Sequence, residues 1–164
     1  MRRISEKLEG LINLQIAREE ESSRLYRAMS ECMKFKGWFG GAALYAKYAK
    51  EEMTHMEKFY NYLQDRDVKP ATPLLKAPPQ EFKDVEEIVK LTYEHEMQVS
   101  KWLSEIAVAA LSEKDLTTYE FMQWFILEQI EEEAKALDLL NIIEIMKSTN
   151  TPMYFLDKEF EKRV

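Results

Sequence analysis

The placement of glycine and proline limits this chain more than any other feature of its sequence. Three of the four glycines lie within residues 37–41, and four of the five prolines lie within residues 70–79. Both residue types end or prevent helices, so their clustering leaves long stretches free to be helical. Apolar side chains in these stretches recur alternately every three and four residues, which is the spacing of one helix face. We therefore predict an all-α chain with helices at residues 5–36, 40–66, 84–111, 116–147 and 153–162.

The lengths of the connections predict how these helices are arranged. Short loops join the first helix to the second and the third to the fourth, so each of these pairs should be antiparallel. The link at residues 67–84 has 18 residues and can span up to ~60 Å, whereas a helix of nearly thirty residues is roughly 40 Å long. The link can therefore run the length of the bundle and leave the second and third helices parallel. This is a ferritin-like four-helix bundle with one long crossover, predicted as a single domain over residues 1–164 with a short fifth helix.

Composition and charge exclude several classes of protein. The 23 basic and 30 acidic residues give a net charge of −7, which argues against nucleic-acid binding because such proteins carry a basic patch. The longest stretch without a charge is far shorter than the ~20 apolar residues that cross a bilayer, so no membrane association is expected. The N-terminus lacks the apolar region of a secretory signal. A single cysteine, Cys32, agrees with a reducing compartment, and we expect the protein to be cytoplasmic.

Each long apolar stripe is interrupted near its middle by ionisable side chains. The interruptions are Glu19 in the first helix, Glu52 and His55 in the second, Glu96 in the third, and Glu128 and Glu132 in the fourth. Glu52 and His55 are three residues apart and share a helix face, as do Gln129 and Glu132.

Burying four carboxylates together is costly unless cations compensate them, and we see no Lys or Arg on the stripes at these levels. Two divalent ions would offset the charges of Glu19, Glu52, Glu96 and Glu132. Carboxylates with one imidazole suit iron or manganese. Di-iron bundles carry a Glu-x-x-His pair on two helices, whereas this chain has one.

Other notable residues are assigned more ordinary positions. His95 points about 100° away from Glu96 around the helix and is predicted to be a surface residue. Cys32 is predicted to be a small core or interface residue. Tyr26 lies two turns from Glu19 on the same stripe, so core packing and a redox role are both open for it, and the same holds for Trp124.

At these residues the chain resembles the bacterial non-haem ferritins, over about residues 4–162. The most specific stretches are residues 51–56 and 128–133, and matching segments also occur at residues 22–26, 95–96 and 154–159. The resemblance implies a ferroxidase that oxidises Fe²⁺ with O₂ or H₂O₂ and stores iron inside a homo-oligomeric shell of twenty-four subunits. One departure is the charged run at residues 18–21, where more apolar character is expected beside a ligand.

The resemblance also implies a set of iron ligands. Glu19, Glu52 and His55 would hold the first iron, and Glu52 would bridge to a second iron held by Glu96 and Glu132, with Gln129 beside it. A third iron site would comprise Glu51, Glu128 and Glu131. Tyr26 matches a tyrosine beside the di-iron centre that supplies an electron.

Three alternatives remain open at the level of the sequence. Another di-iron carboxylate enzyme, such as a rubrerythrin-like peroxidase, would need paired cysteines for its rubredoxin module, and Cys32 is alone. A haem-containing bacterioferritin would carry a second Glu-x-x-His, where this chain has Gln129-x-x-Glu132, so no haem is expected. A structural bundle without metal would require the stripe carboxylates to be solvated. Metal analysis of the purified protein would separate these alternatives.

Overall fold

The chain folds into long helices joined as the sequence predicts. A computed structural model describes residues 3–164. The helices are α1 (Glu6–Phe35), α2 (Phe39–Asp65), α3 (Val85–Ser112), α4 (Leu116–Ser148) and α5 (Tyr154–Glu161). Each predicted helix boundary lies within one residue of the observed one. The all-α four-helix bundle with a short fifth helix is therefore confirmed.

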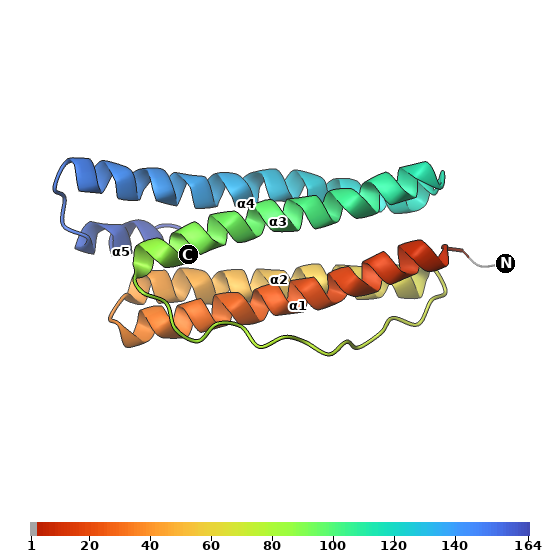
Figure 1. Cartoon of the computed structure of the whole chain (residues 1–164), viewed down its shortest axis with the longest axis horizontal. Helices are drawn as coiled ribbons and strands as arrows, with labels where there is room; N and C mark the ends of the chain where they lie inside the picture. The colour runs from red at the N-terminus through yellow and green to blue at the C-terminus, as the bar shows by residue number, and fades with distance from the viewer. Residues whose placement is uncertain (1–2) are drawn as a thin grey trace.

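The crossover between α2 and α3 spans the length of the bundle. Figure 1 shows it leaving the end of α2, running beside α1 and entering α3 at the opposite end. Because of this long connection, α2 and α3 run in the same direction while α1 pairs with α2 and α3 pairs with α4. The predicted topology is therefore correct, and it places the middles of the four long helices at one level.

Side-chain caps begin three of the four long helices. Ser5 Oγ accepts from the main-chain N–H of Leu8 at 3.1 Å, which begins α1, and Asp84 Oδ1 accepts from that of Glu87 at 2.9 Å, which begins α3. Asp115 caps α4 in the same way, accepting from Thr118 N at 3.0 Å. Such caps satisfy main-chain donors that the helix itself leaves unpaired.

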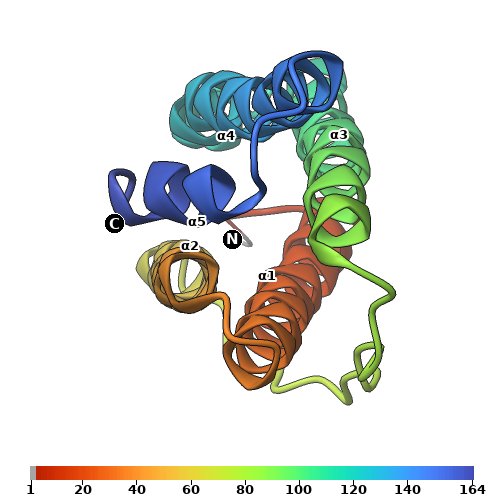
Figure 2. The same ribbon diagram turned by 90° about the vertical axis from the view of Figure 1, so that its left-hand side faces the viewer.

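The start of α2 is capped from a distant part of the chain. Its N-cap residue, Trp38, makes no side-chain cap. Instead Asp157 of α5 accepts from the main-chain nitrogens of Gly40 at 3.1 Å and Gly41 at 2.9 Å. Figure 2 shows α5 between α2 and α4 at this end of the bundle, where Leu156 and Phe160 are fully buried. The predicted fifth helix thus closes one end of the core.

The apolar core consists of two clusters at opposite ends of the bundle. One lies toward α5 and includes Tyr26, Tyr45 and Leu139, and the other lies toward the N-terminus of α1 and includes Ile12 and Phe59. Buried polar side chains from the four long helices occupy the level between them. Among the helices of residues 3–164, none has the length and apolar composition needed to cross a bilayer.

Candidate metal centre

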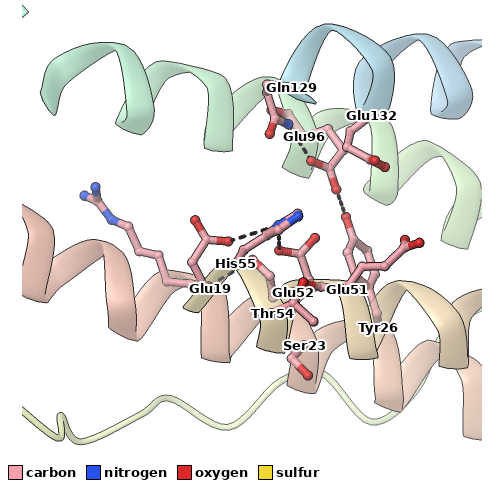
Figure 3. A network of polar contacts seen from close by, with 12 residues as sticks. Glu19, Ser23, Tyr26, Glu51, Glu52, Thr54, His55, Glu96, Gln129 and Glu132 are labelled. Atoms are coloured by element: carbon pink, nitrogen blue, oxygen red, sulfur yellow. Dashed lines mark hydrogen bonds and ion pairs between the residues drawn. The ribbon is translucent and has the colours of Figure 1, made fainter. Parts of the chain in front are cut away.

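Two carboxylates and one imidazole meet where α1 faces α2. Glu19, Glu52 and His55 each offer a ligand atom, and these atoms all lie within 4.8 Å of one another. His55 Nδ1 is 3.2 Å from Glu52 Oε2 and 3.9 Å from Glu19 Oε2. Glu19 is 2% exposed and Glu52 7% exposed. This cluster, drawn in Figure 3, is compact and buried enough to hold a metal ion.

A neighbouring amide holds Glu19 in place. Gln15 lies one turn earlier on α1 and is fully buried, and its Nε2 donates to Glu19 Oε1 at 2.6 Å. This bond fixes one carboxylate oxygen and leaves Oε2 directed toward His55. Residues four apart on a helix lie on the same face, so the Gln15–Glu19 pair follows directly from their spacing.

The third carboxylate, Glu96 of α3, is held from two other helices. The hydroxyl of Tyr26 on α1 donates to its Oε1, and Gln129 Nε2 on α4 donates to its Oε2 at 2.5 Å. The same Gln129 nitrogen also donates to the main-chain oxygen of Glu96 at 3.0 Å. Figure 3 shows Glu96 pointing from α3 toward Tyr26 below it. The three residues thus connect α1, α3 and α4 at the level of the cluster.

The fourth carboxylate, Glu132, has a basic partner. Lys135 Nζ lies 2.7 Å from Glu132 Oε1, one turn further along α4. The sequence predicts no Lys or Arg on the stripes at this level, and Lys135 reaches Glu132 from outside the apolar stripe. Within residues 3–164, Glu19, Glu52 and Glu96 form no ion pair with a lysine or arginine. The negative charge of Glu132 is thus partly neutralised by Lys135, whereas the charges of the other three carboxylates have no lysine or arginine partner among the described residues.

Burial and mutual repulsion shift the pKa values of these carboxyl groups upward. Burial raises the pKa of Glu19 well above its ordinary value, and the negative charge of Glu52 raises it further. For Glu52, burial and then the charge of Glu96 raise the pKa in the same way. Burial raises the pKa of Glu96, although the hydrogen bonds from Tyr26 and Gln129 oppose this rise. A divalent cation would displace the protons and stabilise the charged carboxylates, since metal binding and proton release are linked.

Glu52 lies between the two halves of the site. It contacts His55 on its own helix, and its pKa responds to Glu19 on one side and to Glu96 and Glu132 on the other. A carboxylate in this position has two oxygens available for two different ions.

The residues predicted for a third iron site are less buried. Glu51 is half-buried, and burial followed by the charge of Glu132 raises its pKa. Glu128 is also half-buried, and Glu131 is exposed. Glu128 was expected to interrupt the buried stripe of α4, which is wrong: the inward position is that of Gln129, which is 7% exposed. The reason is that α4 carries apolar side chains around its whole circumference, so its buried face is poorly marked in the sequence.

His95 is not the surface residue that the sequence predicts. Its Nε2 lies 2.7 Å from Ser22 Oγ, and its ring meets the ring of Tyr26 edge-on at 5.9 Å. The Ser22 hydroxyl donates to Arg18 O, so it accepts from His95, whose Nε2 carries the proton. Burial lowers the pKa of His95 to about 4, which keeps the ring neutral. The prediction failed because α3 packs against α1 as well as α4, so a position 100° from Glu96 still lies inside the bundle.

Aromatic side chains pack against His55 and extend from it to the protein surface. Trp124 meets the His55 ring edge-on at 5.6 Å and is 42% exposed, with Lys58 Nζ over its indole ring at 4.4 Å. Phe125 packs edge-on against both rings. Trp124 therefore packs against a candidate ligand. Its position in the sequence had left open whether it packs in the core or has a redox role.

The fold and this centre together define a class of protein: four-helix bundles that hold metal ions between carboxylates projecting inward from facing helices. Comparison with known proteins identifies the family within this class. Residues 9–146 match the family model for the ferritin-like domain. The chain is 33% identical over 154 residues to a bacterial non-heme ferritin from Escherichia coli, covering 94% of this chain and 91% of the relative. The chain belongs to the ferritin family.

Further relatives and solved structures agree with this assignment. A bacterial non-heme ferritin from Bacteroides fragilis is 32% identical, with coverage of 98% of this chain and 99% of the relative. An open pore ferritin from the archaeon Archaeoglobus fulgidus superimposes with a TM-score of 0.95 at 33% identity, over 100% of both chains. The resemblance to non-haem ferritins is therefore confirmed, and iron storage is the function that this membership supports.

Proposed function

We propose that this protein stores iron and that the mid-bundle centre is a di-iron ferroxidase site. The observation that carries the proposal is the buried cluster of Glu19, Glu52 and His55, two carboxylates and an imidazole without a lysine or arginine partner among the described residues. Isolated buried carboxylates are costly, and ion binding offsets that cost. Oxygen donors with one imidazole suit Fe²⁺, which is the substrate here.

The first iron position uses the atoms that already converge. Glu19 Oε2, Glu52 Oε2 and His55 Nδ1 face one another, so an Fe²⁺ ion among them would replace protons rather than pull distant groups together. Gln15 keeps Glu19 oriented. Little rearrangement is then needed on binding, which favours a tight site.

The second position uses Glu96, Glu132 and the remaining oxygen of Glu52. These carboxylates are less available to a metal ion, because Glu96 accepts hydrogen bonds from Tyr26 and Gln129. Glu132 is paired with Lys135. Two Fe²⁺ ions sharing Glu52 can each give one electron to the same O₂ or H₂O₂ molecule. Carboxylate ligands favour the more highly charged Fe³⁺ product, and Glu52 serves both ions throughout.

A third position and a shell complete the proposal. Glu51, Glu128 and Glu131 lie on the two helices that carry Glu52 and Glu132, so they would form a third site beside the second iron. We also propose that the chain assembles into a shell of twenty-four copies, as the resemblance to the bacterial non-haem ferritins implies. The Archaeoglobus fulgidus protein that shares this fold is described as an open pore ferritin, of which a closed form was engineered. Residues 1–164 would then form one ferritin-like domain, and the cytoplasm remains the proposed location.

Iron oxidation kinetics test the proposal. Two Fe²⁺ per subunit, mixed with oxygenated buffer, should give rapid absorbance from Fe³⁺. Glu52→Ala should slow this phase severely because it removes a ligand from both ions, whereas Glu57→Ala, on an exposed turn of the same helix, should not. Light scattering on the same samples reports assembly. Equal rates for the two variants would refute the assigned site, and a monomer with normal oxidation would refute only the shell.

A further inference from the structure

A lysine side chain lies among the carboxylates on the α4 side of the candidate centre. Lys135 Nζ is 2.7 Å from Glu132 Oε1, and the lysine side chain is 40% exposed whereas that of Glu132 is 12% exposed. Burial lowers the pKa of Lys135, but the hydrogen bond and charge of Glu132, followed by the charges of Glu51 and Glu128, raise it above its ordinary value. The side chain is therefore an ammonium ion that interacts with three carboxylates on two helices.

These three carboxylates belong to two different positions of the proposed centre. Glu132 is a ligand of the second iron, and Glu51 and Glu128 are ligands of the third. Figure 3 shows the side chains of Glu51 and Glu132 extending to the same side of the site. Burial and then the charge of Glu132 raise the pKa of Glu51, and the charge of Lys135 opposes this rise. One ammonium group thus neutralises part of the negative charge of both positions.

A second partner for Lys135 is available on its own helix. Glu131 is exposed and lies four residues before Lys135 on α4. A glutamate four residues before a lysine is the favoured order for an ion pair on a helix surface. The lysine ammonium is carried on a flexible four-carbon stem, so it can exchange Glu132 for Glu131 by rotating its own bonds. No movement of α4 is needed for this exchange.

Lys135 differs in kind from the other side chains that hold the candidate ligands. Gln15 and Gln129 are buried neutral amides that donate to Glu19 and Glu96. A neutral amide can keep its hydrogen bond to one carboxylate oxygen while the other oxygen binds a metal ion. An ammonium ion beside the same carboxylate repels a metal cation, because both carry positive charge. Lys135 and a metal ion therefore compete for the same negative charge.

We propose that Lys135 is a tethered competitor of iron. Its ammonium pairs with Glu132 while the second position is empty, moves to Glu131 when Fe²⁺ binds there, and returns to Glu132 when the ion leaves. This inference rests on the proposed ferroxidase function. While Glu131 is paired with the lysine, the third site keeps two carboxylates, Glu51 and Glu128. The third site should therefore be the last position to fill.

The return of the lysine also makes release from the second position easier. A partly buried carboxylate that loses its metal ion is left with an uncompensated charge, which is costly. Lys135 supplies a positive charge to Glu132 as the ion leaves, whereas Glu19 and Glu52 have no lysine or arginine partner within residues 3–164. An ion at the second position should therefore leave more readily than an ion at the first.

Crystal structures at a series of Mn²⁺ concentrations test the competition, because anaerobic Mn²⁺ is not oxidised and anomalous scattering locates it. In the wild type, Lys135 Nζ should pair with Glu132 without metal and with Glu131 once the second position is filled. The third position should then have low occupancy. At the same concentration Lys135→Met should raise that occupancy several-fold, and Lys135→Arg, which retains the charge, should not. Release of Mn²⁺ to a chelator should be several-fold slower from Lys135→Met.

Lys47→Met is the matched control. Lys47 also acts on the charge of Glu51, but its Nζ donates to the main-chain oxygen of Arg163 at 3.0 Å. Its removal takes away the same charge and should change third-position occupancy much less than Lys135→Met does. A lysine still paired with Glu132 beside a filled second position would refute the competition alone, as would equal occupancies in Lys135→Met and Lys47→Met. If no variant held Mn²⁺ inside the bundle, the proposed centre and the competition would both be refuted.

Discussion

Gln129 holds Glu96 by two hydrogen bonds from a single nitrogen, one to the main-chain oxygen at 3.0 Å and one to carboxylate Oε2 at 2.5 Å. The amide therefore acts in this structure as a donor that orients a candidate ligand. Glu128 precedes it and an acidic run follows at residues 131–133. As a neutral side chain, the Gln129 amide adds no negative charge at the second iron position, where a carboxylate would add one.

Replacing this amide by a carboxylate should affect the metal-free and metal-bound states in opposite directions. Gln129→Glu removes a donor and sets a second negative charge against Glu96, which should destabilise the metal-free fold by about 1–3 kcal/mol. With a divalent ion bound, the extra carboxylate should tighten the second position and slow iron turnover. Thermal unfolding with and without Zn²⁺ measures both effects. Gln123→Glu, which lies outside the centre on the same helix, is the control, and an equal response of the two variants would refute the role of Gln129.

The two iron positions should differ in affinity. The first has no basic partner, whereas a metal ion at the second must displace Lys135 from Glu132. Lys135→Met should therefore strengthen binding of the second ion by a factor of about 1.4 to 5, because a partly exposed ion pair contributes ~0.2–1 kcal/mol.

Anaerobic calorimetric titration with Zn²⁺ resolves the two binding steps. Lys90→Met, which removes a solvent-exposed lysine 3.8 Å from Glu94, should leave both steps unchanged. Equal affinities in the wild type, or a weaker second step in Lys135→Met, would contradict the asymmetry.

The metal-free protein should lose stability as the pH rises. The pKa values of Glu19 and Glu52 are raised in the fold by burial and mutual repulsion, so above the ordinary carboxyl pKa of about 4.3 the folded state holds more protons than the unfolded state. The contribution of these two groups to the free energy of unfolding is therefore complete below the ordinary carboxyl pKa. It decreases as the pH rises through their raised pKa values.

Thermal unfolding of metal-free protein between about pH 5 and pH 8 tests this linkage. Glu19→Gln should flatten the decline, and Glu57→Gln should not. Saturating Mn²⁺ should restore stability most strongly at the upper end, by ~2.7 kcal/mol at one hundred times its dissociation constant. A wild-type unfolding midpoint that does not fall over this range, or that falls no more steeply than the midpoint of Glu19→Gln, would contradict the shifted pKa values.

The helices and their connections were predictable because glycine, proline and apolar spacing act locally. Ser5, Asp84 and Asp115 stand where caps are needed, and the length of the crossover leaves few other arrangements. The inward positions of Glu19, Glu52, His55 and Glu96 followed from the stripes, because the stripes of α1 to α3 are clearly amphipathic.

What the sequence did not predict depends on contacts between helices. Exposed apolar residues such as Leu127 and Ile130 obscure the buried face of α4, so Glu128 was placed on the buried stripe although Gln129, which shares a face with Glu132, is the residue that lies inward. His95 was misplaced because the angle between α3 and α1 is not visible in one helix. The cap that Asp157 provides for α2 joins residues more than a hundred positions apart, which no local pattern indicates.

The contact between α5 and α2 should depend on the absence of a side chain at one position. A Cβ atom on Gly40 would overlap the main-chain oxygen of Asp157, so Gly40→Ala should destabilise the fold by about 1–3 kcal/mol. Gly10 has open space around it within α1, and Gly10→Ala should stabilise by roughly 0.5–1 kcal/mol. Urea unfolding compares the two. A Gly40→Ala variant as stable as the wild type would show that α5 does not depend on this close approach.

Anomalous diffraction at the iron edge, from crystals soaked anaerobically in Fe²⁺, tests the proposed centre most directly. The account predicts two peaks inside the bundle on either side of the Glu52 carboxylate, one beside His55 and one beside Glu132. At limiting Fe²⁺ the peak beside His55 should be the stronger. Iron found on the surface of the bundle with no peak beside Glu52, or preferential filling beside Glu132, would contradict the account.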